Sequence, residues 1–507
     1  MADIPKITDK VSLPLKIHIR SYMMDHRFEG HAVLPAVEAI RLLAASTSGY
    51  LPNIDITSTI DAEFHRFLYI KPGVEQIRAI NELEVSDDGT VVSRLVIKTR
   101  SKKTSITRKK DHVTLSFAKN PQEPNPPPLD EVFALEGVAM DIAPSSLYGE
   151  LVRFGPAYHN VKGVLTLSEK GAIAGVHAPN DGPPEEPLGS PFPLDAAFHA
   201  ACAWGQRFSG FVGFPVGFEK RYIFNKTLPG KTYIGRVFPK TTGPGLVVFD
   251  IWIYDEAGVF HEAALGVQMK DISRGRIKPP QWIMDGAGHD RLGSLKKHCK
   301  ALSVIELKTV KGGAVKTLSN TETDRLGRMG EKRKNSYLGA RLCCKTLSRQ
   351  LSGDDKKTPA HSITTISADM IRPCCPTTDG EDRFSCSVSH DSRFVFAVAS
   401  HGRVGIDVEA ISKRALKSRR RYMSERETIL LEEDLPIGEI EASVMVWSIK
   451  EAVVKAFGIN LADSWERVVV KEIGREKSIL YFDGKRYAAF HAKVDKHMFT
   501  IIFASRC

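Results

Sequence analysis

Gly405-Ile406-Asp407-Val408-Glu409 is the stretch that decides the fold of the C-terminal part of the chain. Its acids alternate with aliphatic residues, which is the period of a β-strand, so both carboxylates point to one face. Trp447-Ser448-Ile449-Lys450-Glu451-Ala452-Val453-Val454-Lys455 has a helical pattern that places Glu451 and Lys455 on one helix face. Three acids and a lysine gathered in this way suit the binding of Mg²⁺ against a phosphate, because this cation prefers oxygen ligands.

Two further elements accompany these stretches. Ser387-Val388-Ser389-His390 stands upstream of them, and Tyr422-Met423-Ser424-Glu425-Arg426-Glu427 lies between them. In this order the four elements resemble the 4'-phosphopantetheinyl transferases of the type that activates surfactin synthetase. The resemblance implies a pseudo-twofold α+β domain of two similar halves, with coenzyme A as substrate and Mg²⁺ as cofactor.

The same resemblance implies a role for each polar residue of the two stretches. Asp407, Glu409 and Glu451 would hold Mg²⁺. Glu451, or a bound water, would also accept the proton of a serine on an acyl carrier protein. Lys455 would neutralise charge on the leaving nucleotide, and Lys450 is assigned to the same task.

The resemblance also places residues of the first half against coenzyme A. His390 would contact one of its phosphates. Glu331 to Leu342 is predicted to be a basic helix whose Lys334 and Arg341 face the 3'-phosphate, although a solvated basic face would look the same in sequence.

The composition of the chain limits its class. It has 507 residues, 42% of them hydrophobic and 26% charged, which is typical of globular protein with several compact units. No apolar run could span a bilayer, so we expect no membrane segment. The cysteines form no paired Cys-x-x-Cys motifs, so we expect a reduced, cytoplasmic setting. The net charge of +11 favours an acidic partner such as an acyl carrier protein. No nucleic-acid-binding motif accompanies that charge, so we expect no nucleic-acid partner.

Two breaks in the pattern predict the domain boundaries. A proline-rich run over 119–128 separates two units, about 1–120 and 129–274, of a first domain that covers 1–274. Strand alternation then stops, which predicts a linker over 275–300 and a transferase domain over 301–507. We expect a fragment that begins near Ala301 to fold alone, and the sequence leaves a homodimer open.

Each unit of the first domain has one helical pattern among several strand patterns. The first helix is predicted after Pro35 and the second from Pro193. One long central helix wrapped by strands is the composition of a hot-dog fold, so the fold class is α+β with an N-terminal double hot-dog domain.

Three motifs of this domain resemble those of polyketide-synthase dehydratases. They are His26-x-x-x-Gly30-x-x-x-x-Pro35, Gly155-Pro156-Ala157-Tyr158 and Leu194-Asp195-Ala196-Ala197-Phe198-His199. The resemblance implies that His26 removes the α-proton of a 3-hydroxyacyl thioester and that Asp195 protonates the leaving hydroxyl. Such a pair needs a neutral histidine and a protonated acid. His199, which stands where the family more often has glutamine, is expected to orient the acid or the substrate.

Three alternatives stay open from the sequence. The first domain would also suit a silent carrier-docking platform. A product-template domain shares the double hot-dog fold and a His/Asp pair but directs aromatic cyclisation. A carrier-binding scaffold with one or both sites silent is the alternative for the whole chain.

Overall fold

The computed structural model describes residues 6–100, 107–119, 121–180, 187–287, 290–367, 372–377, 384–432 and 437–504. The chain divides into two compact units. Unit 1 contains residues 1–126 and 140–288, and unit 2 contains residues 127–139 and 289–507.

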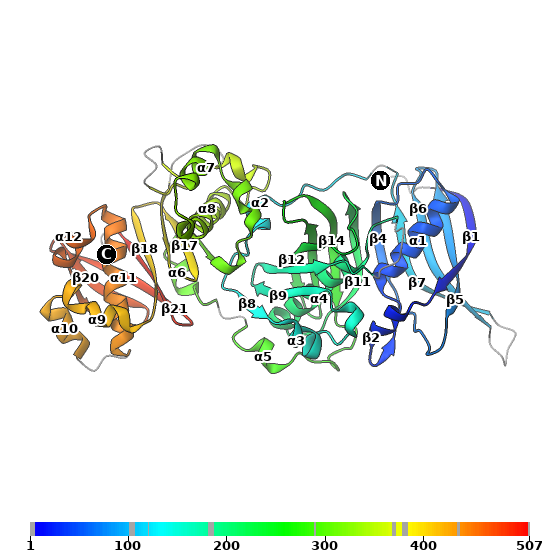
Figure 1. Ribbon diagram of the computed structural model, residues 1–507, viewed down its shortest axis with the longest axis horizontal. Helices are drawn as coiled ribbons and strands as arrows, with labels where there is room; N and C mark the ends of the chain where they lie inside the picture. Colours follow the sequence, from blue (N-terminus) through cyan, green and yellow to red (C-terminus); the bar gives the residue numbers. More distant parts are fainter. Residues whose placement is uncertain are drawn as a thin grey trace. The chain divides into compact units, whose positions relative to one another are not determined.

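Unit 1 is built on a single antiparallel sheet of twelve strands (Figure 1). In sheet order the strands are β1 (Ile7–His18), β5 (Gln76–Ser86), β6 (Val91–Arg100), β7 (Thr107–Phe117), β4 (Ser58–Phe64), β11 (Phe214–Ile223), β14 (Phe260–Lys270), β13 (Leu246–Tyr254), β12 (Thr232–Gly243), β10 (Gly171–His177), β9 (Val161–Ser168) and β8 (Met140–Ile142). Pairing of β4 with β11, for example Ala62 opposite Phe218, joins the two halves edge to edge.

Each half of the sheet packs against one long helix, as predicted. These are α1 (Ala36–Tyr50) and α4 (Phe192–Ser209). The small residues of α4 let it sit deep in the sheet, and the helix is buried continuously from its start to Gln206. Gly210 ends it in the left-handed conformation, at φ 71°. The α+β class and the hot-dog arrangement of unit 1 are thereby confirmed.

Short elements complete unit 1 and carry parts of the site. They are the helical turns η1 (Ser21–Asp25), α3 (Pro144–Ser146), η2 (Leu147–Leu151), η3 (Pro156–Tyr158) and α5 (Gln281–Met284), and the hairpin of β2 (Arg27–Phe28) with β3 (His31–Ala32). Glu29 and Gly30 both have positive φ in the turn of this hairpin. Gly30 is exposed there, so its place in the His26 motif is explained by the turn.

Unit 2 contains two antiparallel sheets, each covered by one long helix. The first sheet has the order β15 (Ala301–Glu306), β17 (Phe394–Ser400), β16 (Ser385–His390), and α8 (Glu331–Leu351) packs on it. The second has the order β18 (Val404–Ala410), β22 (His497–Phe503), β21 (Lys485–Val494), β20 (Lys477–Phe482), β19 (Val468–Glu472), with α11 (Glu439–Phe457) against β18 and β22. The remaining helices are α2 (Leu129–Val132), α6 (Gly293–Lys296), η4 (Leu307–Thr309), η5 (Gly312–Thr317), α7 (Asn320–Gly327), η6 (Ala360–Ser362), α9 (Lys413–Tyr422), α10 (Glu425–Glu432) and α12 (Leu461–Arg467).

The two halves of unit 2 share a buried polar arrangement. Glu322 binds the backbone of Ser319 at the start of α7, and its carboxylate is 2.9 Å from Nζ of Lys345 on α8. In the second half the carboxylate of Glu427, which follows Ser424 by three residues, is 2.9 Å from Nζ of Lys450 on α11. The same Ser-x-x-Glu turn therefore holds a lysine of the long helix in each half, as two similar halves require.

The boundaries between the units differ from the predicted ones. Residues 127–139 follow the proline-rich run but pack within unit 2. The predicted linker over 275–300 contains α5, whose Ile283 is buried in the core of unit 1, and α6, whose Leu295 is buried in unit 2. The structure therefore argues against independent folding of a fragment that begins at Ala301.

Among the described residues, no helix has both the length and the hydropathy needed to span a bilayer.

Candidate active sites

The first candidate site lies in unit 1, where η1 brings His26 to the start of α4. Nε2 of His26 is 4.0 Å from Oδ1 of Asp195, and the two side chains are only 14% and 6% exposed. The predicted pair is therefore brought together from positions 169 residues apart. The separation exceeds a hydrogen bond, so atoms of a substrate could approach both groups.

The hydrogen bonds of His26 decide which of its nitrogens can act as a base. Nδ1 lies 3.3 Å from the carbonyl oxygen of Val33. Because a carbonyl only accepts, the hydrogen of a neutral His26 is on Nδ1 and the lone pair of Nε2 faces Asp195. Burial lowers the pKa of His26 to about 4, which keeps the ring neutral near pH 7.

Aromatic side chains of the Gly155 motif fix the ring of His26. Phe154 stacks on it with a centroid distance of 4.3 Å, and Tyr158 meets it edge-on at 5.0 Å. The Gly155 motif is hydrogen-bonded to Asp25, the residue that precedes His26. Asp25 accepts hydrogen bonds from the N–H groups of Gly155 and Ala157. A Cβ on Gly155 would lie 2.3 Å from Cγ of Asp25, so glycine is required for this close approach.

His199 approaches Asp195 from the next turn of α4. Its Nε2 is 3.0 Å from Oδ2 of Asp195, although the two atoms lack the alignment of a hydrogen bond. Its Nδ1 is 3.3 Å from the hydroxyl of Tyr148, which itself accepts from Val161 N–H at 2.8 Å. The Tyr148 proton is thus directed to His199, and the predicted orienting role of His199 gains a partner that the sequence did not indicate.

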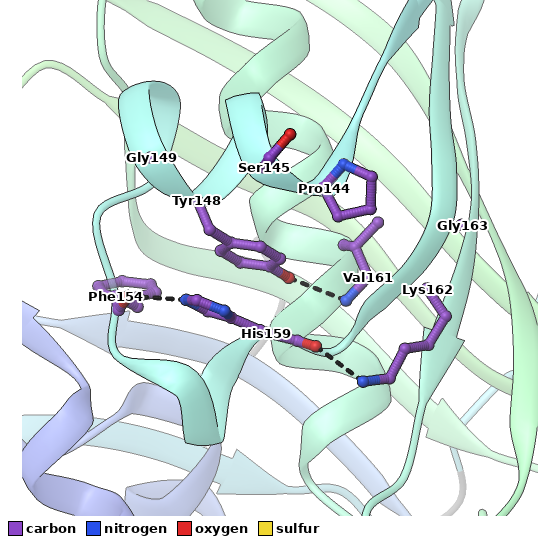
Figure 2. A pocket seen from close by; sticks show the side chains of 9 residues that line it. All are labelled: Pro144, Ser145, Tyr148, Gly149, Phe154, His159, Val161, Lys162 and Gly163. Atoms are coloured by element: carbon purple, nitrogen blue, oxygen red, sulfur yellow. Dashed lines mark hydrogen bonds between the residues drawn. The ribbon is translucent and has the colours of Figure 1, made fainter.

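A pocket of about 500 Å³ opens beside the side chains of His26 and His199. Figure 2 shows Tyr148 and His159 lying face to face in it, with a centroid distance of 4.1 Å, and Phe154 next to them. Lys162 donates to the carbonyl oxygen of His159 at 3.1 Å. Phe154 and Tyr148 therefore line the pocket and also contact the rings of the His26 and His199 group.

The second candidate site lies in unit 2, where α11 crosses β18. Asp407 is nearly buried on β18, and its Oδ1 accepts from Ser389 Oγ at 2.9 Å and from Lys455 Nζ at 3.2 Å. Lys455 also donates to Ser389 at 2.8 Å, which connects β16, β18 and α11. The sequence predicts no role for Ser389, although the residue belongs to the motif that ends at His390.

The three predicted carboxylates influence one another electrostatically. Burial and then the charge of Asp407 raise the pKa of Glu409 to about 7, and Glu451 contributes to this shift. Burial and Asp407 raise the pKa of Glu451 as well. Oδ2 of Asp407 is buried without a hydrogen-bond partner. A cation would stabilise this group of one buried and two half-buried carboxylates.

The set is not arranged as a finished metal site. Within the described part of the chain, no three His, Cys, Asp or Glu side chains are grouped closely enough to hold a metal ion. The ammonium of Lys455 takes the place of a cation on Asp407, and Glu409 accepts from Trp447 Nε1 at 3.2 Å. The predicted ligands Asp407, Glu409 and Glu451 therefore need these contacts to rearrange before they could converge on one ion.

The residues predicted to bind coenzyme A lie in different surroundings. His390 is exposed at the end of β16, where partial burial and then the charge of Lys455 lower its pKa. Lys334 is half-buried and paired with Glu331 at 2.5 Å. Arg341 is buried and donates to Thr365 Oγ1 at 2.9 Å. Of these three residues, only His390 lies near the predicted Mg²⁺ ligands, since the charge of Asp407 affects its pKa.

Lys450 does not lie where a contact with the leaving nucleotide would need it. It is fully buried and donates to Glu427 at 2.9 Å and to the carbonyl oxygen of Tyr422 at 2.6 Å. Burial lowers its pKa, and the charge of Glu427 opposes that shift. Its ammonium is used inside the core, as is that of Lys345 in the first half, so it cannot neutralise a leaving nucleotide.

Gly405 explains how closely α11 approaches β18. A Cβ at this position would lie 1.9 Å from the carbonyl oxygen of Ala452 and 2.5 Å from the nitrogen of Ala456. Both are backbone atoms of the helix that carries Glu451 and Lys455. The glycine therefore sets the distance between the acids of the strand and the charged face of the helix.

We expect Gly405→Ala to push α11 away from β18 and to cost about 1–3 kcal/mol of unfolding free energy. Hydrogen exchange of the amides of α11 and β18 in increasing urea measures the loss. Gly402→Ala is the matched control, because a Cβ there meets nothing within 4 Å. Equal stability of the two variants would contradict this explanation of Gly405.

Two family models match parts of the chain. A family model described as the polyketide synthase dehydratase N-terminal domain matches residues 126–277, a range that includes Asp195 but not His26. The model of the 4'-phosphopantetheinyl transferase superfamily matches residues 403–502, which include Asp407, Glu409, Glu451 and Lys455.

One curated protein and several solved structures are similar to parts of the chain. The 4'-phosphopantetheinyl transferase gsp of Aneurinibacillus migulanus is 31% identical over 116 residues, which are 21% of this chain and 48% of that protein. The chain thus spans about half the length of this curated relative.

Two of the similar solved structures are dehydratase domains of polyketide synthases. That of a mycocerosic acid synthase-like polyketide synthase has 16% identity and a TM-score of 0.43, over 54% of this chain and 98% of that one. A trans-AT polyketide synthase dehydratase domain from Brevibacillus brevis has 14% identity and a TM-score of 0.43, over 52% of this chain and 94% of that one. Two parts of the chain thus match known families: residues 126–277 match the polyketide synthase dehydratase N-terminal domain, and residues 403–502 match the 4'-phosphopantetheinyl transferase superfamily.

Proposed function

We propose that the chain is a bifunctional enzyme of polyketide or fatty-acid biosynthesis that acts on an acyl carrier protein. Unit 2 would transfer 4'-phosphopantetheine from coenzyme A to a carrier serine, and unit 1 would dehydrate 3-hydroxyacyl carrier thioesters. The observation that carries the proposal is that each unit holds its own buried acid group beside a base or cation, on residues that the sequence motifs had singled out.

In unit 1 the geometry supports elimination by His26 and Asp195. The Nε2 lone pair of His26 would take the α-proton, and a protonated Asp195 would give its proton to the leaving oxygen, releasing water. Return of the proton from His26 to Asp195 across the 4.0 Å gap would restore both groups. The position of His199 supports this assignment, because its Nε2 lies 3.0 Å from Oδ2 of Asp195, while Oδ1 faces His26 and stays available for the proton that is donated.

In unit 2 the residues support phosphoryl transfer, which depends mainly on positioning and charge neutralisation. Mg²⁺ bound to Asp407, Glu409 and Glu451 would neutralise charge on the pyrophosphate of coenzyme A. Lys455 would move from Asp407 to the departing nucleotide phosphate, and His390 would contact another phosphate. Glu451, or a bound water, would accept the serine proton.

The carrier protein would dock on basic residues close to this site. Helix α9 carries six exposed or half-buried basic side chains and none that is acidic: Lys413, Arg414, Lys417, Arg419, Arg420 and Arg421. Acyl carrier proteins are acidic, so charge complementarity would speed their association.

The pH dependence of elimination follows from the pKa of His26. The folded pKa of about 4 lies below the ordinary value of 6.5, so the base stays neutral until the pH falls toward 4. We expect kcat/KM for elimination to lose activity on the acidic side with an apparent pKa near 4. An acid limb centred near the ordinary value of about 6.5 would contradict the buried neutral base.

The same shift makes folding depend on pH. Between pH 6.5 and about pH 4, His26 is protonated in the unfolded state but not in the folded state. The free energy of unfolding therefore decreases as the pH is lowered from 6.5 to about 4. His26→Gln should remove this contribution, which urea unfolding at pH 7 and pH 5 would measure.

A further inference from the structure

We propose that residues 127–139 are an integral part of the transferase unit and connect its core to the turn that follows His390. In sequence this segment lies between the two halves of unit 1, and the dehydratase family model begins at residue 126 and includes it. The consequence for activity rests on the proposed transfer function, whereas the structural claim can be tested without it.

The segment is anchored by a buried, bidentate ion pair. Nε and Nη2 of Arg349 on α8 donate to the two carboxylate oxygens of Asp130 at 2.8 and 2.7 Å. The side chains are 3% and 0% exposed. Arg349 also donates to the carbonyl oxygen of Asp355 at 2.6 Å. Loss of one partner would leave the other charge buried and unpaired, which is strongly unfavourable.

Apolar burial and backbone pairing extend this anchor along the segment. Val132, Phe133 and Leu135 are fully buried. Gly137 donates from its backbone to the carbonyl oxygen of Val304 at 2.8 Å, and Glu136 pairs with Ile305 as an antiparallel bridge. Because β15 is an edge of its sheet, the segment covers backbone groups that the edge would otherwise leave unpaired.

The end of the segment reaches a buried carboxylate that orders the turn after His390. The backbone N–H of Ala139 donates to Oε1 of Glu306 at 2.9 Å, and Glu306 is fully buried. Arg393 binds the same carboxylate through Nε and Nη2, both at 3.0 Å. Its backbone N–H donates to Asp391 at 2.7 Å, next to His390. Glu306 and Arg393 therefore act as positioning residues between the segment and a residue proposed to contact coenzyme A.

The path of the chain gives this arrangement a further consequence. The chain passes from one unit to the other after residues 126, 139 and 288. A single cut after residue 286 would leave the segment covalently attached to unit 1 and packed within unit 2. The two activities would remain joined even without the last connection.

Hydrogen exchange of the wild-type chain in sub-denaturing urea tests the structural claim without any assay of activity. We expect the amides of Leu135, Gly137 and Ala139 to open with those of β15 and α8, because cooperative units exchange together. Opening together with β9 and β14 of unit 1, or exchange at the rate of free peptide, would overturn the proposal.

A protease site inserted between Gly286 and Ala287 in the full chain tests the consequence. After cleavage, the fragments should co-elute in native gel filtration and should remain active in transfer to apo carrier protein. Asp130→Asn should weaken their association about 100-fold or more, which equals about 3 kcal/mol at 1.4 kcal/mol per tenfold change. Glu131→Gln is the matched control, because this neighbouring acid pairs with a solvent-exposed Lys356.

Each outcome of the cleavage experiment has one meaning. Separation of the unmodified fragments, or equally tight association of the Asp130→Asn and Glu131→Gln fragments, would overturn the proposal. If the fragments stay together but the uncut chain transfers nothing, the proposed transfer function fails while the structural inference stands. If Asp130→Asn does not fold, hydrogen exchange of the wild-type chain decides the question.

Discussion

Asp407→Asn is expected to reduce phosphopantetheine transfer by about 10²- to 10³-fold or more, because it removes the negative charge of a predicted Mg²⁺ ligand of the proposed site. The substitution should change the free energy of unfolding little. Oδ2 of Asp407 is buried without a partner, and its charge raises the pKa of Glu409 and of Glu451. Relief of this repulsion should offset the lost contact with Lys455, leaving unfolding free energy unchanged or about 1 kcal/mol higher.

The measurement for Asp407 is the intact mass of an apo carrier protein incubated with coenzyme A and Mg²⁺, alongside urea unfolding of the variant. Asp483→Asn is the matched control, since Asp483 is an exposed acid of the same unit that pairs with Arg467. The control should retain activity. Wild-type transfer by Asp407→Asn would exclude the acidic group as the site of phosphoryl transfer.

His26→Ala and Asp195→Asn should each lower elimination from a 3-hydroxyacyl carrier thioester by about 10²- to 10⁴-fold, the usual contribution of a positioned acid or base. The double variant should be little worse than either single one, because the two residues act as one unit. Neither change should alter transfer, since both residues belong to unit 1.

His177→Ala is the control for the dehydratase variants. His177 lies on β10 with a hydrogen bond to Thr232 at 3.0 Å, outside the His26 group. The reverse reaction, hydration of the enoyl thioester, gives a second readout. Absence of both directions in the wild type, over several chain lengths, would favour a docking platform. Cyclisation of a poly-ketone chain would favour a product-template domain.

The fold of each site followed from local sequence periodicity. Alternation over 405–409 predicted β18, and the spacing of four between Glu451 and Lys455 predicted a shared helix face, which the structure places against the strand. Lys450 shows the limit of this reasoning. A residue adjacent to Glu451 lies about 100° around a helix from it, so Lys450 points elsewhere. Its partner Glu427 is distant in sequence and could not be inferred from spacing.

Other features depend on contacts between distant parts of the chain. Asp130 and Arg349 are separated by 219 residues, and no local pattern shows that a segment after a proline-rich run packs in the second unit. Tyr148 reaches His199 from 51 residues away. Propensity and periodicity describe an element and its buried face, but partners of this kind are set by tertiary packing.

One incubation tests the central claim that a single chain carries both activities. Purified wild-type protein is mixed with Mg²⁺, apo carrier protein and a 3-hydroxyacyl-coenzyme A, and the intact mass of the carrier is followed with time. We expect first a gain equal to one 3-hydroxyacyl-phosphopantetheine and then a second species lighter by one water. His26→Ala should give only the first species, and Asp407→Asn should give neither. A carrier whose mass never changes, or a loaded carrier that never loses water with any acyl chain, would contradict the account.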